Sequence, residues 1–139
     1  MNSFVQTNFF CNLVFVIKST NMTHVELGNL GEELAVQFLR KQNIHIRDCN
    51  FKFKKGEIDI VGETDEHIIV YEVKTRETAE IGEPYKAVTR SKQKQIIKVA
   101  DYYVKQMNLQ KNVRFDIISI VHNSYRTKIE HIEDAFFPM

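Results

Sequence analysis

The chain has 139 residues, 43% hydrophobic and 27% charged, which predicts one globular domain with one core. Its formal net charge is only +1, so overall charge does not indicate nucleic acid or a membrane as a partner. Cys11 and Cys49 are too few and too far apart for a disulfide framework or a zinc site, which favours a cytoplasmic location.

Residues 1–21 differ from the rest of the chain. The run from Phe9 to Ile17 is apolar apart from Asn12, but it is shorter than the roughly 18 to 20 residues that span a bilayer. No basic residue precedes it and no small-x-small cleavage pattern follows, which argues against a signal peptide. We expect a dispensable or poorly ordered extension, with Met22 as an alternative start and the domain over 22–139. A membrane-touching segment is the second interpretation.

The first predicted helix begins at a capping box. The Thr23 hydroxyl caps the helix and Glu26 reaches back three residues later. The helix is expected to continue to about Gln42, with Asn43 as a left-handed stop. An apolar stripe indicates its buried side, formed by Leu27, Leu30, Leu34 and Phe38.

Glu32 is displaced from the polar side of this helix. Glu33 lies on the solvated face, whereas Glu32 lies at the edge of the apolar stripe, beside Gly28. Gly28 and Gly31 permit close approach of a strand or a ligand, because they carry no side chain. Glu32 is therefore expected to face inward toward a site, and the alternative is an edge carboxylate in water.

After the first helix, the sequence predicts three strands, a second helix and then two more strands. A turn at residues 63–66 predicts an antiparallel hairpin, and a loop is expected at 78–83 before a short helical turn at Pro84. The second helix is expected from Ser91 to about Met107. Strands are predicted at 44–53 (with a break near 48–50), 58–61, 68–73, 113–121 and 128–132. This order predicts an α/β domain with a central mixed β-sheet flanked by helices.

The second helix has a basic side. Its apolar face is expected to hold Ile96, Ile97, Ala100, Tyr103, Val104 and Met107. A stripe of lysines, Lys94, Lys98 and Lys105, lies opposite, and the polar Gln93 falls within the apolar arc. Residues 86–114 hold eight Lys or Arg and one acid, Asp101. Such a segment is either a surface that contacts phosphates or a solvated helix face.

The stretch from 56 to 76 carries the charges that suggest chemistry. Asp59 and Glu72 interrupt apolar strand runs, where charge is costly. Strand side chains alternate, so Glu72 and Lys74 share a face. If Asp59 lies opposite Val70 or Glu72, all three charges share that face, whereas a one-residue slip would pair Asp59 with Tyr71.

Two close carboxylates repel, and a hard divalent cation such as Mg²⁺ or Mn²⁺ removes the repulsion. Asp59 and Glu72 are the candidate ligands, with the Val73 carbonyl as a further oxygen and Glu32 binding directly or through water. Lys74 could orient or help deprotonate the attacking water in metal-assisted phosphodiester hydrolysis. Nearby cations, Arg76 and the helix lysines, could hold a nucleic-acid backbone. The alternative is a surface ion pair worth ~0 to 1 kcal/mol.

The spacing of these charges resembles the PD-(D/E)xK nuclease motif of the restriction-endonuclease-like fold. More specifically, the chain resembles the YraN-type family of uncharacterised bacterial proteins, related in fold to archaeal Holliday-junction resolvases. The matching segments are Gly28-x-x-Gly31-Glu32-x-x-Ala35, Gly56-Glu57-Ile58-Asp59-Ile60-Val61, Tyr71-Glu72-Val73-Lys74-Thr75-Arg76, Lys92-Gln93 and Arg114-Phe115-Asp116. Ile58 stands where the motif has proline, and the first 21 residues have no counterpart in the family.

The resemblance implies a nuclease-like core whose site is formed by Glu32, Asp59, Glu72 and Lys74. It also implies a supporting polar residue, Gln93, beside Lys92 on the second helix. The leading hypothesis is a Mg²⁺- or Mn²⁺-dependent endonuclease that acts on branched or damaged DNA, as a homodimer by analogy with the resolvases. The alternatives are a non-catalytic nucleic-acid-binding module and an interaction protein in which Glu72 and Lys74 form only an ion pair.

Overall fold

A computed structural model describes residues 22–78 and 88–138. The elements are α2 (His24–Lys41), β1 (His45–Phe53), β2 (Gly56–Glu63), β3 (His67–Arg76), α3 (Arg90–Gln106), β4 (Asn112–His122) and β5 (Thr127–Phe136). This confirms the predicted order, although β5 continues beyond the expected end at Ile132. The N-terminal extension, the loop after Thr78 and the turn at Pro84 lie outside the described residues. No helix within 22–78 or 88–138 is long and apolar enough to cross a membrane.

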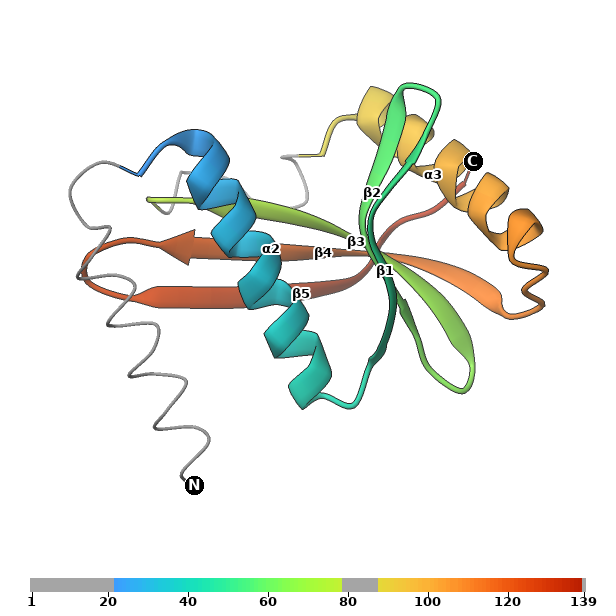
Figure 1. Cartoon of the computed structure of the whole chain (residues 1–139), viewed down its shortest axis with the longest axis horizontal. Helices are drawn as coiled ribbons and strands as arrows, with labels where there is room; N and C mark the ends of the chain where they lie inside the picture. Colours follow the sequence, from blue (N-terminus) through green and yellow to red (C-terminus); the bar gives the residue numbers. More distant parts are fainter. Residues whose placement is uncertain (1–21, 79–87, 139) are drawn as a thin grey trace.

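The five strands form one mixed sheet in the order β1-β2-β3-β4-β5. Strands β3 and β4 are parallel, and the other neighbouring pairs are antiparallel. The parallel pair requires a crossover, and α3 is part of that connection. Figure 1 shows the β1–β2 ribbon crossing steeply over the other three strands, with α2 and α3 toward opposite ends of the sheet. The expected α/β class with a mixed sheet is confirmed.

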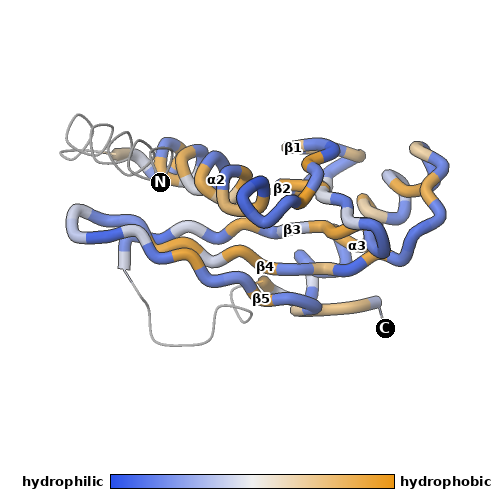
Figure 2. Tube along the Cα trace, turned by 90° about the horizontal axis from the view of Figure 1, so that it is seen from below, coloured by the Kyte–Doolittle hydropathy of each residue, from blue (hydrophilic) through white to orange (hydrophobic). Residues whose placement is uncertain are grey.

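Each helix covers a different face of the sheet. Along β3, Ile69 and Tyr71 belong to the cluster packed against α2, whereas Ile68 and Val70 belong to the cluster packed against α3. This alternation follows from the two-residue period of a strand, so β3 is buried on both sides. Figure 2 shows the hydrophobic segments, in orange, along the central strands and on the helices that cover them.

The start of α2 follows the predicted capping box. The Glu26 amide donates to Thr23 Oγ1 (3.2 Å), and the Thr23 amide donates to Glu26 Oε2 (2.8 Å). Asn43, just after the helix, has a φ of 62°, as expected for a left-handed stop. Gly31 is buried against β3, because a Cβ there would lie 1.8 Å from Thr75 Oγ1. Gly28 does not share this role, since a Cβ there would meet nothing within 4 Å.

The buried face of α3 differs slightly from the prediction. Ile96, Ala100 and Tyr103 are buried as expected, but Val99 is buried with them. Met107 lies just beyond the helix as its C-cap residue and is 41% exposed. The three lysines of the predicted basic stripe are all exposed.

The strand predicted to break near Asn50 is continuous, but it is irregular there. The β1–β2 register shifts between Ile46 and Asp48, and Asn50 has a φ of 54°. On the paired strand, Ile58 packs in the α3 cluster whereas Ile60 packs in the α2 cluster. Side chains two residues apart on a regular strand would share a face. The ribbon therefore turns from one face of the sheet to the other at Asp59.

Candidate functional site

The hairpin register brings the two acids together. Ile60 pairs with Tyr71 and Val61 with Val70, so the next position along the same register puts Asp59 opposite Glu72. The predicted turn is also present, since the Thr64 amide donates to the His67 carbonyl (2.9 Å). The slipped register that would have paired Asp59 with Tyr71 is excluded.

Asp59 is anchored where β2 separates from β3. The amide of Val73 donates to Asp59 Oδ2 (2.8 Å), a bond from strand backbone to side chain. Burial raises the pKa of Asp59, and the Val73 hydrogen bond opposes that shift. The Asp59 carboxylate is thus held in a fixed position at the point where the ribbon changes faces.

Glu72 is a deeply buried acid with two cations nearby. It is 4% exposed, while Lys74 Nζ lies 3.7 Å and Lys92 Nζ 3.9 Å from its Oε1. Burial and the neighbouring Asp59 raise the pKa of Glu72 to about 8, and the two lysines reduce this shift without cancelling it. With a pKa of about 8, Glu72 carries a proton near neutral pH.

The environment of the second carboxyl oxygen of Glu72 indicates what Asp59 and Glu72 could bind together. Oε2 is buried and has no hydrogen-bond partner among the described residues, and the Glu72 carboxyl interacts with that of Asp59, which is favourable only if one of the two keeps a proton. A divalent cation in place of that proton would satisfy both carboxylates. Two carboxylates plus water and phosphate oxygens match the typical ligand set of Mg²⁺. The donors present therefore fit a Mg²⁺ or Mn²⁺ ion.

Glu32 approaches this pair from the α2 side. It is half-buried, in contrast to the exposed Glu33, and it lines a pocket of about 490 Å³ together with Asp59 and Asn50. Burial and the charge of Asp59 raise the pKa of Glu32. Within 22–78 and 88–138 no three His, Cys, Asp or Glu side chains gather closely enough to bind one metal ion. Glu32 is therefore placed near Asp59 but not as a third direct ligand.

Only some of the residues predicted to contact nucleic acid lie beside Asp59 and Glu72. Lys92, in the first turn of α3, is held beside Glu72. Gln93, its neighbour, instead donates from Nε2 to the Val88 carbonyl (3.0 Å) and lines a different pocket with Phe136. Arg76 is the last residue of β3 and is half-buried. The resemblance named Lys92 together with Gln93. The contact between the Lys92 ammonium group and Glu72 is what places Lys92 beside the acid pair.

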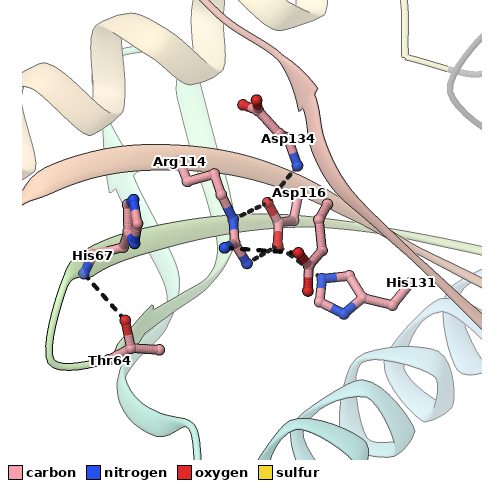
Figure 3. A network of polar contacts seen from close by, with 7 residues as sticks. Thr64, His67, Arg114, Asp116, His131 and Asp134 are labelled. Atoms are coloured by element: carbon pink, nitrogen blue, oxygen red, sulfur yellow. Dashed lines mark hydrogen bonds and ion pairs between the residues drawn. The ribbon is translucent and has the colours of Figure 1, made fainter.

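A second group of charges forms a network that the sequence analysis did not predict, although Arg114 and Asp116 belong to one of the matching segments. Asp116 on β4 is fully buried and binds Arg114 through two hydrogen bonds (2.9 and 2.8 Å). It also contacts His131 Nε2 (2.7 Å) and accepts from the Asp134 amide (3.0 Å), as Figure 3 shows. Burial alone would raise the pKa of Asp116, but these hydrogen bonds hold it below its ordinary value. The network joins β4 to β5.

Comparison with known proteins gives one consistent result. A sequence model described as "Uncharacterised protein family UPF0102" matches residues 31–120. The chain is similar to the UPF0102 protein of Christiangramia forsetii, with 46% identity over 82% of this chain and 96% of that protein. It is 39% identical to UPF0102 protein FP2501 of Flavobacterium psychrophilum, again over 82% and 96%. The UPF0102 protein of Clostridium beijerinckii is 44% identical, over 80% and 93%.

Proposed function

We propose that this chain, which belongs to the uncharacterised protein family UPF0102, is a divalent-metal-dependent endonuclease that hydrolyses phosphodiester bonds. The single observation that carries the proposal is the pair of carboxyls formed by the buried Glu72 and the half-buried Asp59, with two lysine ammonium groups within 4 Å of Glu72. A buried pair of acids costs stability unless something is bound between them. An ordinary surface ion pair would leave the acid exposed, whereas Glu72 is 4% exposed.

In this proposal Asp59 and Glu72 hold a Mg²⁺ or Mn²⁺ ion, and the Val73 carbonyl and Glu32, through water, complete its surroundings. When bound, the ion would lower the pKa of water and neutralise charge on the phosphoryl group. Lys74 then orients the attacking water and stabilises developing negative charge. Lys92 approaches the same carboxyl from α3 and holds a phosphate oxygen.

We also propose that the domain has a restriction-endonuclease-like core. Support comes from the element order, from the mixed sheet and from the acids at the point where β2 leaves β3.

A homodimer acting on branched DNA, with Arg76 and Gln93 near the DNA backbone, fits the same proposal. A cytoplasmic location fits the free thiol of Cys49.

A second candidate function is nucleic-acid binding without cleavage, and the exposed lysines of α3 favour it. The exposed lysines of α3 give this side of the protein a basic surface, which suits binding to phosphates without cleavage. In that case the acid pair would have only a structural role, and nucleic acid would be bound but not cut.

The test is cleavage of branched, single-stranded and duplex DNA by purified protein with Mg²⁺, with Mn²⁺ or with EDTA. We expect metal-dependent cleavage that Asp59→Asn and Glu72→Gln each reduce at least a hundredfold, since both remove a ligand oxygen or its charge. Glu66→Gln, at an exposed acid in the β2–β3 turn, is the matched control and is expected to cleave like wild type. Cleavage that survives Glu72→Gln would reveal a contaminating nuclease. Salt-sensitive binding with no cleavage under any metal would favour the binding module.

A further inference from the structure

Another pocket, of about 840 Å³, lies between the β1–β2 turn and α3. We name it the aromatic–lysine pocket after six of its lining residues: Phe53, Lys54, Lys55, Lys98, Tyr102 and Lys105. The acid pair and Glu32 do not line it, so it is separate from the proposed metal site. Gly56 fixes its shape, because a Cβ there would lie 2.5 Å from Val99 Cγ2 on α3. The turn is therefore held directly against the helix.

Two rings form the apolar part of this pocket. Phe53 and Tyr102 stack with their centroids 3.7 Å apart and their planes 6° from parallel. Both are only partly buried, whereas the neighbouring Tyr103 is 1% exposed and belongs to the core. A stacked pair that stays accessible to a pocket presents a flat apolar surface on which another ring can stack.

The charges around the rings point to a phosphate-bearing ligand. Four lysines line the pocket with a single acid, Asp101, and that acid pairs with Lys105 (2.8 Å). Lys54 Nζ lies over the Phe53 ring, 5.4 Å from its centroid. Aromatic rings among cations are the combination that binds single-stranded nucleic acid, since bases stack and phosphates pair with lysine.

We propose that the aromatic–lysine pocket binds an unpaired nucleotide of single-stranded DNA, with its base against Tyr102 and Phe53 and its phosphates on the lysines. This inference rests on the proposed function and names its substrate class: DNA with a single-stranded segment. Lys92 and Tyr102 are ten residues apart on α3, about 15 Å along the helix axis. A strand of about four nucleotides, at roughly 3.4 Å each, spans that distance. The unpaired segment would thus lie a few nucleotides from the bond that is cut.

The absence of tryptophan from the chain allows a direct test. Tyr102→Trp introduces a single indole into the pocket, and we expect its emission to be quenched when a short oligothymidine is added in EDTA. Tyr125→Trp is the matched control. Tyr125 is 93% exposed in the β4–β5 turn, at the other end of the molecule from α3 (Figure 1), and its emission should not change. Equal quenching in both variants, or no quenching in Tyr102→Trp, would overturn the proposal.

Binding measured by fluorescence anisotropy gives a second readout. Wild type is expected to bind the oligothymidine more tightly than a duplex of the same length. Tyr102→Ala is expected to weaken single-strand binding by roughly 5- to 150-fold, the range that loss of one stacked base produces, while Tyr102→Phe keeps it. Lys98→Ala, at an exposed position that leaves the core intact, should also weaken binding and make it less salt-dependent. Unchanged affinity in both alanine variants would contradict the proposal.

These outcomes separate this inference from the proposed function. All binding is measured in EDTA, so it does not depend on a metal ion at the acid pair. Cleavage by wild type, together with unquenched emission from Tyr102→Trp, would reject the pocket and leave the endonuclease. Quenched emission from Tyr102→Trp, without cleavage by wild type under any metal, would keep the pocket and reject the endonuclease.

Discussion

Glu72 stands out among the individual residues because its side chain is an acid in the interior. Its pKa is about 8 in the folded protein against an ordinary 4.5, so below pH 4.5 it is protonated whether the chain is folded or not. Between these values the folded state binds the extra proton. The stability of the metal-free protein should therefore decline as pH rises from about 4.5 to about 8, by at most about 1.4 kcal/mol per pH unit, and should level off above that range.

Glu72→Gln should remove this decline, because the amide carries no charge at any pH. We expect the variant to equal or exceed the stability of wild type at about pH 9 and to differ less at about pH 6. Urea unfolding in EDTA measures both values. Glu66→Gln, at an exposed acid in the same hairpin, should keep the slope of wild type. Identical slopes for wild type and Glu72→Gln would show that Glu72 is ionised throughout.

Asp116 behaves in the opposite way, since its partners stabilise its charged form. Asp116→Asn should destabilise the protein by about 3 to 5 kcal/mol, because Arg114 and His131 lose the buried charge that they bind. The wild-type contribution should disappear as pH falls through the lowered pKa of Asp116, and the variant should lack that acid-side loss.

Chemical denaturation near neutral pH measures the loss in the free energy of unfolding caused by Asp116→Asn. The matched control is Asp101→Asn, which removes an exposed acid paired with Lys105 on α3. That change should cost less than about 1 kcal/mol. Equal effects of the two substitutions would mean that the Asp116 network contributes no more than a surface pair.

For the helices and strands, short-range features of the sequence were sufficient to predict most of the fold. The capping box at Thr23, the left-handed Asn43 and the turn before His67 each depend on residues within a few positions of one another. The alternation of the strand was likewise enough to place Glu72 and Lys74 on one face, whereas the register that brings Asp59 to Glu72 was left open. These features were predictable because short-range hydrogen bonds and side-chain periodicity determine them.

The errors and omissions depend on contacts between distant segments. Asp116 and His131 are on separate strands, and nothing local indicates that they meet. The end of β5 was missed because Glu133 and Asp134 interrupt its apolar pattern, although Phe136 pairs with Phe115. The resemblance implied Gln93 as a supporting residue of the site, and the structure places its Nε2 on the Val88 carbonyl, a contact that nothing in the sequence pattern indicates.

The contact between α2 and β3 gives a prediction with an internal control. Gly31→Ala would place a Cβ within 3 Å of all three side-chain heavy atoms of Thr75, so rotation of Thr75 cannot relieve the clash. We expect a loss of about 1 to 3 kcal/mol and weaker cleavage, because α2 would move away from β3 together with Glu32.

Gly28→Ala, three residues earlier on the same helix, meets nothing within 4 Å. It should stabilise the protein by up to about 1 kcal/mol through helix propensity. Thermal unfolding of both variants, with wild type, makes the comparison. If Gly31→Ala were as stable as Gly28→Ala, close helix–strand packing would not position this site.

Within residues 22–78 and 88–138, the sheet has one helix on each face and one ribbon that changes faces. Asp59 lies at that change, between Glu32 on the α2 side and Glu72 with Lys92 on the α3 side. The proposed metal site and the aromatic–lysine pocket then share α3 as a common support. This arrangement would bring a DNA strand along α3 to the acid pair.

The most direct test of the central claim is calorimetric titration of Mn²⁺ into wild type and Asp59→Asn at neutral pH. The account predicts that wild type binds the ion and releases the proton held on Glu72, so the measured heat changes with the ionisation enthalpy of the buffer. Asp59→Asn should bind at least tenfold more weakly, because one of the two charged ligands is gone. Equal binding by the two proteins, or no binding by wild type, would contradict a metal site at Asp59 and Glu72.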